Sequence, residues 1–389
     1  MTAGRVTVHN EIAAIGRDEW NAVAGDDYPF LSHEFLIAAE QSGCVSENSG
    51  WLPCHLALRH ANGSLRAALP LYEKQDSWGE FVFDWAWANA YDRAGLNYYP
   101  KLVSAVPFTP APSRRLLLAD GNDNEAAATL LQAAINLAQA RECSSLHVLF
   151  PAPHEIPALD ALGLKIRKDC QFHWQNRRYA DFDEFLGTFS SKKRKKARRD
   201  RRHVVEAGIR FRRLTGAALT PEVWGSIYPL ISRTFMRRGS MPYFNLAFFE
   251  QISRSLADKL LVVLAEDSAG PVAAAVFFVG KDVLYGRYWG SNANYNSLHF
   301  ETCYYQGIDY CIEHSIATFE PGTQGEHKIS RGFLPTTTYS AHWLAQPAFF
   351  DAIGDYVAEE ARHIDRYMEA VDKHSPYRNS PNSDGEDST

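Results

Sequence analysis

The chain has 389 residues and a formal net charge of -6, with 46% hydrophobic and 22% charged residues. This composition suits a globular protein and excludes a disordered chain, and the negative charge gives no overall attraction to nucleic acid. One hydrophobic core rarely supports so long a chain, so the length predicts two domains.

The cysteines and the N-terminal residues indicate a cytoplasmic protein. Six cysteines are scattered without a C-x-x-C pair, and the first residues lack the basic and apolar regions of a signal peptide. Apolar runs stay shorter than the ~18 residues that a transmembrane helix needs. We therefore expect reduced thiols, no transmembrane segment and a cytoplasmic location.

The first half of the chain predicts the order β-β-β-α-β. Residues 54–72 contain two alternating apolar runs that flank Asn62-Gly63, which predicts a β-hairpin. An aromatic segment at 81–91 follows and is counted as the third strand. An Ala/Leu-rich helix is then predicted over 124–140 and a short strand over 145–150.

The second half repeats this order. A hairpin is predicted over 261–280 around the turn 267–270, then an aromatic strand at 283–290, a helix at 298–314 and a strand at 316–320. The repeat, at a spacing of about 200 residues, predicts an α/β (α+β) fold of two related units, each with a mixed, mostly antiparallel sheet flanked by helices. The alternative is coincidence, because a hairpin followed by a helix is common.

These patterns also set the expected boundaries. The N-terminal domain is predicted over 1–185 and the C-terminal domain over 186–373, the latter including a basic linker helix at 191–207. Residues 374–389 are rich in Ser, Asn, Pro and acidic residues, which predicts a disordered tail.

The most basic stretch of the chain runs from Ser190 to Arg202. Ser190 or Ser191 can cap a helix that ends near Gly208. Like-charge pairs four residues apart cost such a helix a few tenths of a kcal/mol each, so we expect it to face an anion. A solvated face is the alternative. The candidate anion-binding residues are Lys192, Lys193, Arg194, Lys195, Arg198 and Arg199.

Aromatic loops in the first unit are candidates for lining a substrate-binding cleft. They contain many amphipathic rings together with one acidic and one basic residue, although core packing under a long loop is the alternative for any single ring. The candidate residues are Asp84, Trp87, Tyr91, Tyr98, Tyr99, Lys101, Phe108 and Thr109.

In the second unit, Arg287 and Trp289 alternate on a predicted strand and should share a face. His299, Cys303 and Gln306 should lie along one stripe of the next helix, for which a half-buried amphipathic helix is the alternative reading. The further candidate substrate-binding residues of this unit are Glu301, Tyr305, Gln324, Arg331 and His342.

Several kinds of site have no support in the sequence. His299, Glu301, His327 and His342 are metal-ligand types, but no H-E-x-x-H or paired-Cys spacing is present, so no metal is expected. Nor is there a G-x-S-x-G elbow, a P-loop or a G-x-G-x-x-G before a helix.

The segment QGEHKISRGF, residues 324–333, holds four ionisable side chains within six positions. They are Glu326, His327, Lys328 and Arg331. Charge density of this kind occurs in a solvated loop and also around a reacting centre. The residues alone favour the solvated loop.

Several segments together resemble one family. They include GEFVFDWAWANAY from Gly79, NYYPKL from Asn97, SKKRKKARRDRR from Ser191, HFETCYYQ from His299 and GTQGEHKISRGFLP from Gly322. The chain resembles the bacterial FemAB-like peptidoglycan biosynthesis/recognition proteins, which are expected to be N-acyltransferases. More distantly it is similar to Fem aminoacyl transferases and to tandem copies of the Gcn5-related acyltransferase (GNAT) fold.

This resemblance implies acyl transfer from an activated ester or thioester to a small-molecule or peptide-like amine. The donor would be acyl-CoA or aminoacyl-tRNA, used as a co-substrate rather than as a permanently bound cofactor, and tRNA is the one macromolecular partner implied. The Arg/Gln-x-x-Gly-x-Gly/Ala loop that binds CoA in GNAT enzymes is absent from the sequence, which weakens the acyl-CoA alternative.

The resemblance also assigns roles to the segment 324–333. Lys328 would stabilise the developing oxyanion, and Glu326 or His327 would handle protons. Arg287 and Arg331 would hold a carboxylate or phosphate. The competing interpretations are a non-catalytic protein that recognises ligands resembling peptidoglycan precursors, and an RNA-binding protein that uses the basic helix.

Overall fold

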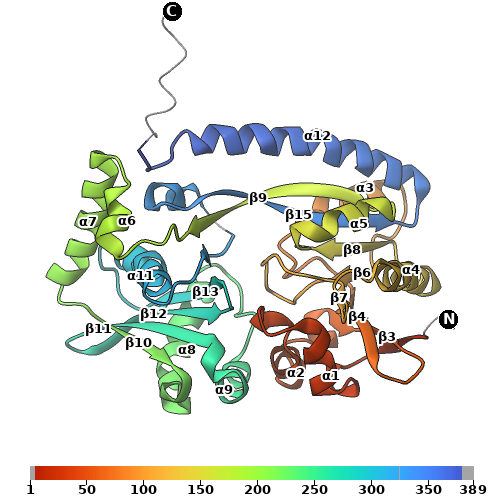
Figure 1. The fold of residues 1–389 in the computed structure, drawn as a ribbon, viewed down its shortest axis with the longest axis horizontal. Coiled ribbons are helices and arrows are strands. Elements are labelled where there is room, and N and C mark those ends of the chain that lie inside the picture. Colours follow the sequence, from red (N-terminus) through yellow and green to blue (C-terminus); the bar gives the residue numbers. More distant parts are fainter. Residues whose placement is uncertain (1–4, 324, 379–389) are drawn as a thin grey trace, which may run out of the picture.

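The structure is a computed structural model that describes residues 5–323 and 325–378. Two units, each with an antiparallel run of strands and a helical crossover, are joined into one molecule (Figure 1). Among the described residues, no helix combines the length and the apolar character that crossing a membrane requires.

The second unit is built on a run of antiparallel strands. They are β10 (Arg210–Thr215), β11 (Leu260–Asp267), β12 (Gly270–Val279) and β13 (Val283–Ser291). A helical crossover made of α10 (Leu298–Phe300), a π-helical turn (Glu301–Tyr305) and α11 (Gln306–Glu313) then leads to β14 (Thr318–Glu320). Because of this crossover, β14 lies parallel to β13.

The first unit repeats these pairings with its hairpin split between two sheets. One sheet of four strands contains β1 (Val6–His9), β3 (His55–Arg59), β4 (Leu65–Leu69) and β7 (Leu117–Leu118). The continuations of the two hairpin strands, β2 (Trp51–Pro53) and β5 (Tyr72–Lys74), join β6 (Lys101–Ser104) and β8 (Ser145–Leu149) in the large sheet. The crossover helix α4 (Asn124–Ala140) makes β8 parallel to β6.

Two long strands connect the units. β9 (Lys165–Gln175) and β15 (Leu334–Leu344) pair with each other over most of their length. β9 belongs to the first half of the chain but ends against β14, whereas β15 belongs to the second half but pairs with β8. The exchange produces a single sheet of eleven strands. The helix α12 (Pro347–Asp372) runs along both strands (Figure 1).

Helices from both units share one hydrophobic core. It is built by α1 (Arg17–Ala24), α2 (His33–Gln41), α8 (Pro221–Met236) and α9 (Leu246–Ser255) together with the strands that they cover. Phe35 of α2 packs against Phe278 of β12 with ring centroids 5.8 Å apart, so the units meet through buried aromatic rings. Gly290 allows α8 to lie directly on β13, since a Cβ there would stand 1.9 Å from the Leu230 carbonyl oxygen.

Most of the predicted elements are confirmed. Both hairpins, the helix over 124–140 and the mixed α/β fold of two units have the expected form. The basic stretch forms α7 (Ser191–Glu206), although the Ser190 side chain makes no capping hydrogen bond.

One predicted element is wrong, and the tail is described only in part. Residues 81–91 do not form a strand, because α3 (Trp85–Arg93) begins within them and β6 is the third strand instead. The boundary between 185 and 186 stays a prediction. Of the predicted tail, Tyr377 packs on the body and its hydroxyl donates to the Gly332 carbonyl at 2.8 Å, while 379–389 lie outside the described residues. The short helices α5 (Ile156–Ala161) and α6 (Phe182–Gly187) complete the chain.

Candidate functional site

A cavity opens where β13 and β14 diverge. The two strands pair from Val283 with Thr318 to Tyr285 with Glu320, after which β13 continues to Ser291 paired with β12. The gap holds a cavity of about 480 Å³. Its lining comes from both units and consists of Trp78, Phe81, Phe108, Pro110, Thr234, Phe235, Arg238, Ser240, Tyr243, Gly286, Arg287, Tyr288, Trp289, His299, Tyr304, Pro321, Gly322, Thr323, His327 and Lys328.

Lys328 is the most unusual ionisable group of this lining. It lies on a turn of 3-10 helix, Glu326–Arg331, that follows β14, and it is 2% exposed. Its Nζ donates a hydrogen bond to the Gly322 carbonyl. Burial, together with the smaller effect of the nearby Arg287 guanidinium, lowers the pKa of the Lys328 amine to about 7. Near neutral pH the amine is therefore divided between its charged and neutral forms.

Arg287 supplies a buried cation to the same cavity. Its Nη1 donates to the Gly286 carbonyl at 2.9 Å, and its Nη2 lies 3.5 Å from Oε2 of Glu320. Burial raises the pKa of Glu320 to about 7, so this carboxyl neutralises Arg287 incompletely at neutral pH. The buried Nε–H of Arg287 has no hydrogen-bond partner among the described residues.

The π-helical turn determines which side chains of the crossover helix reach the cavity. In an α-helix, residues three or four apart share a face, whereas the wider π turn brings residues five apart together. His299 and Tyr304 accordingly lie side by side with ring centroids 5.3 Å apart. The Tyr304 hydroxyl is 2.9 Å from Nε2 of His327. Burial lowers the pKa of His299 to about 4 and also lowers that of His327, which keeps both imidazoles neutral at pH 7.

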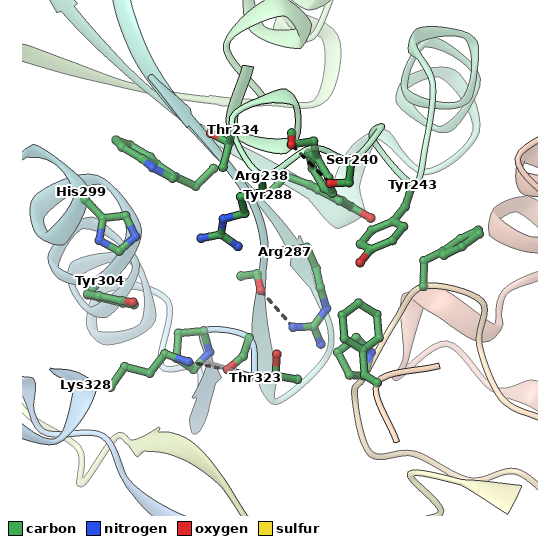
Figure 2. Close-up of a pocket in the computed structure, with 18 of the residues that line it drawn as sticks. Thr234, Arg238, Ser240, Tyr243, Arg287, Tyr288, His299, Tyr304, Thr323 and Lys328 are labelled. Atoms are coloured by element: carbon green, nitrogen blue, oxygen red, sulfur yellow. Dashed lines mark hydrogen bonds between the residues drawn. The ribbon is translucent and has the colours of Figure 1, made fainter. Parts of the chain in front are cut away.

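The remaining walls come from the connection between α8 and α9 and from loops of the first unit. Tyr243 stacks on Phe108 with ring centroids 5.0 Å apart and an interplanar angle of 16°. Figure 2 shows His299 and Tyr304 on one side of the cavity, Tyr243 on the opposite side, and Arg238 and Arg287 between them. The first unit thus contributes apolar rings, and the second contributes the polar groups.

The charge of the described lining has one sign. Arg238, Arg287 and Lys328 are present, and the lining residues within the described part of the chain include no Asp or Glu. An anionic group or a carbonyl oxygen is the ligand chemistry that such a lining stabilises.

The structure brings six of the residues proposed from the sequence to the cavity. They are Phe108, Arg287, Trp289, His299, His327 and Lys328. Glu326 is exposed and accepts a hydrogen bond from the Tyr367 hydroxyl at 3.0 Å, away from the cavity. Gln324 lies outside the described residues.

Four other candidates of the second unit lie away from the cavity, and three of them contact α7. Glu301 accepts from Arg201 at 3.0 Å and from Gln306 at 2.8 Å. Tyr305 and Arg331 both donate to Asp200 at 3.1 Å. The stripe of His299, Cys303 and Gln306 is divided, because the π turn rotates Gln306 away.

The first-unit candidates form a buried cluster beneath the loops. Lys101 is fully buried, and its Nζ donates to Glu80 Oε2 and Ser77 Oγ at 2.8 Å and also to Asp84. The Tyr98 hydroxyl donates to Asp84 at 2.7 Å. Burial raises the pKa of Glu80 to about 7. Burial also acts to raise the pKa of Asp84, but the Lys101 ammonium outweighs it and lowers the pKa of Asp84 to about 2.

Apart from Phe108, the other first-unit candidates and His342 of the second unit pack around the same cluster. His342 lies 2.7 Å from His147 between their Nδ1 atoms, and the Trp87 ring is 4.8 Å from the His342 ring. Tyr91 packs on Tyr98, Tyr99 contacts Ser77 through its hydroxyl, and Thr109 is buried. These residues do not line the cavity between β13 and β14.

The cationic face of α7 is largely open to solvent. Lys192, Lys195, Lys196 and Arg199 are exposed, and Lys193 and Arg194 are half-buried. Arg198 pairs with Asp183 at 2.9 Å through two exposed side chains. Within the described part of the chain, no cluster of three or more His, Cys, Asp or Glu side chains is arranged to hold a metal ion.

Sequence reasoning missed Arg238, Tyr243 and Tyr304. Tyr304 is part of the HFETCYYQ segment, but only the π turn, which periodicity does not predict, directs it at the cavity. Arg238 and Tyr243 lie in an irregular connection without a motif, so the sequence carried no signal for them.

A family model described as FemAB-like, peptidoglycan biosynthesis/recognition, matches residues 11–379. The chain belongs to this family. The resemblance inferred from the sequence is therefore confirmed. No curated protein sequence matches the chain significantly.

Solved structures share the fold of this FemAB-like chain. The crystal structure of FemX matches with a TM-score of 0.54 at 12% identity, covering 90% of this chain and all of that one (100%). A conserved protein from Bacteroides thetaiotaomicron matches with a TM-score of 0.52 at 11% identity, covering 87% of this chain and 99% of that one. L-PGS from Bacillus licheniformis matches with a TM-score of 0.50 at 10% identity, covering 86% and 98%. At these identities the likeness concerns the fold.

Proposed function

We propose that this FemAB-like protein is an acyltransferase that moves an acyl or aminoacyl group from an activated ester or thioester to an amine acceptor. The cavity between β13 and β14 is its reaction site. The observation that carries this proposal is the buried Lys328, whose pKa is lowered to about 7, in a described lining without carboxylates. Such a site favours the negative charge that develops on a carbonyl oxygen during acyl transfer.

The reaction forms one bond and breaks another at the same carbonyl carbon. The neutral amine nitrogen attacks the carbonyl, whose oxygen becomes negative, and Lys328 in its ammonium form donates to that oxygen. When the carbonyl re-forms, the C–O or C–S bond to the donor breaks. The nitrogen loses one proton and the departing alkoxide or thiolate gains one, so the charges balance.

Neutral groups beside Lys328 are suited to this proton transfer. His327 and the Tyr304 hydroxyl are joined at 2.9 Å, and His299 lies next to Tyr304. A neutral imidazole accepts a proton from the amine, and the same group can return it to the leaving oxygen or sulfur. Glu326, in contrast, is held outside the cavity by Tyr367 and takes no part in this scheme.

The donor is proposed to be an acyl-CoA thioester or an aminoacyl-tRNA ester, with no permanently bound cofactor. Both carry phosphate groups, which Arg238 and Arg287 can bind inside the cavity and the cationic face of α7 can bind outside it. The acceptor is a small-molecule or peptide-like amine.

The proposal is tested by identifying the donor and then removing the lysine. Mass spectrometry of molecules that copurify with the protein gives the donor class, and transfer to a panel of amines is then measured with wild type and Lys328→Met. Lys281→Met is the matched control, because the Lys281 side chain is 67% exposed and its ion pair with Asp27 is long, at 3.7 Å. Full transfer by well-folded Lys328→Met would refute the assignment, and ligand binding without turnover on any donor would favour a binding protein.

A further inference from the structure

Asp200 is the one acidic residue within the basic stretch of α7, and its side chain points into the protein. It is 8% exposed, and its Oδ2 accepts from Arg331 Nη2 at 3.1 Å and from the Tyr305 hydroxyl at 3.1 Å. Ser297 Oγ lies 3.3 Å from Oδ1. The helix with the most cationic outer face is thus attached to the protein body through a buried anion.

The Arg331 guanidinium connects three elements at this point. Besides Asp200 on α7, its carbon lies 3.3 Å from the centroid of the Phe300 ring on α10. Its Nη1 donates to the His327 carbonyl at 2.7 Å, within the turn that carries Lys328. The side chain is 3% exposed, so solvent weakens these interactions little.

A second contact fixes α7 to the crossover helix. Arg201 donates to Glu301 at 3.0 Å and to Asp309 at 2.6 Å. The π turn and α10 carry Tyr304 and His299, and the 3-10 turn carries His327 and Lys328. The elements bound by Arg201 and Arg331 are therefore the ones that carry His299, Tyr304, His327 and Lys328.

A buried ion pair of this kind determines geometry more than it adds stability. Apolar residues of similar volume often stabilise a protein equally well. A guanidinium, however, directs its N–H groups in fixed directions within a plane, and here Nη1 is directed at the His327 carbonyl and Nη2 at Asp200.

We propose that Asp200 is a positioning residue that fixes Arg331 and thereby holds Lys328 and His327 at their distance from His299 and Tyr304. The kinetic consequence rests on the proposed acyl transfer. The geometric consequence needs no substrate, because the reactivity of the Lys328 amine reports its surroundings directly.

The test compares Asp200→Asn with Asp183→Asn. The control variant removes Asp183 of α6, the exposed ion-pair partner of Arg198 on α7, and does not alter the cavity. Lys328 is labelled with isotopic acetic anhydride from pH 6 to 10, and the labelled peptide is quantified by mass spectrometry. The charged or titratable groups that face Lys328 are Arg287, Cys303, His173, His299 and His327.

We expect Asp200→Asn to shift the midpoint of the Lys328 labelling profile and Asp183→Asn to leave it at the wild-type value. With a donor and acceptor in hand, Asp200→Asn should lower kcat by about 100-fold, the usual cost of misplacing a reacting group by 1 Å, with the KM for the donor unchanged. An Asp200→Asn protein that unfolds at lower temperature but keeps the wild-type profile would show a purely structural role and overturn the proposal.

Two further outcomes are decided by the same experiment. Where Asp200→Asn does not fold, Tyr305→Phe removes one of the two hydrogen bonds to Oδ2 without removing charge, and it must shift the profile in the same direction. An unshifted Tyr305→Phe profile then overturns the proposal. Where wild type transfers no acyl group, the proposed function fails, and the labelling profile still decides the role of Asp200.

Discussion

The two units repeat the same strand pairings, but the gap beyond the parallel pair is a cavity in the second unit and is filled in the first. In the first unit the gap beyond the parallel pairs of β6 and β8 is filled by the chain itself, with Ser113 bridging Pro151. Arg115 is fully buried there, and its Nε donates to the Leu149 carbonyl at 2.8 Å. In the second unit the Nε–H of Arg287 has no partner among the described residues.

The two units also differ in the surroundings of a buried lysine. Both units bury a lysine, but Lys101 faces two carboxylates while Lys328 faces a cation and a carbonyl. The first arrangement raises the pKa of its lysine despite burial, and the second lowers it. The surrounding charges, rather than the burial of a lysine, distinguish a structural group from a chemical one.

The largest expected effect concerns the first unit. Lys101→Met should lower the free energy of unfolding by about 3–5 kcal/mol, because Glu80 and Asp84 would lose their buried counter-ion. Urea unfolding measures this loss, with the exposed Lys281→Met as control. A change in the free energy of unfolding below about 1 kcal/mol would mean that the Lys101 cluster does not stabilise the fold.

In the second unit, Lys328→Met should act on catalysis instead of folding. Loss of one oxyanion donor lowers kcat by about 100- to 1,000-fold, whereas removing a poorly solvated cation leaves the free energy of unfolding unchanged or higher. Wild-type kcat should also fall as the pH rises through about 7, since the ammonium form is lost. Steady-state kinetics and urea unfolding on the same preparations check both parts.

The contributions of Lys328 and Glu80 to the pH dependence of the free energy of unfolding should differ in sign. The pKa of Lys328 is about 7 in the folded protein against 10.5 ordinarily, so the unfolded chain binds more protons between these values and the free energy of unfolding rises with pH there. Glu80, at about 7 against 4.5, makes the free energy of unfolding fall between pH 4.5 and 7.

Lys328→Met should remove the rise above pH 7, and Glu80→Gln should reduce the fall below it. Urea titrations of both variants and wild type from pH 5 to 10 measure the slopes. Slopes that match the wild type in both variants would contradict the assigned pKa directions.

The smallest effect on the free energy of unfolding is expected from substitutions on the cationic face of α7, the proposed anion-binding surface outside the cavity. Replacing Lys195 and Lys196 by Glu should change the free energy of unfolding by no more than about 0.5 kcal/mol, since both side chains are exposed. The variant should elute from a heparin column at a lower salt concentration than wild type. Unchanged retention would leave the cationic face as a solvated surface.

Local patterns predicted the repeated elements well. The Asn62-Gly63 turn, the helix over 124–140 and the basic helix depend on residues near one another in the sequence, so periodicity and turn chemistry suffice. Lys328 was proposed from the family resemblance and Arg287 from its position on a predicted strand, and both line the cavity.

The parts that were missed depend on distant contacts. Nothing local distinguishes Lys101 in a buried cluster from a lysine in a cleft, because its partners Glu80 and Asp84 come from another segment. Tyr304 depends on a π turn, and Arg331 on an aspartate 131 positions away. The pairing of β9 with β15 is not visible in any window of the sequence.

The exchange of β9 and β15 has a consequence for synthesis of the chain on the ribosome. β8 pairs with β15, which is synthesised only after nearly all of the second half. At usual elongation rates the delay between the two strands is on the order of 10 s or more. Until then the edge of β8 is an unpaired strand in a nascent protein, the kind of surface to which chaperones and other chains bind. Separately expressed halves should therefore aggregate, while coexpressed halves can complete each other's sheets.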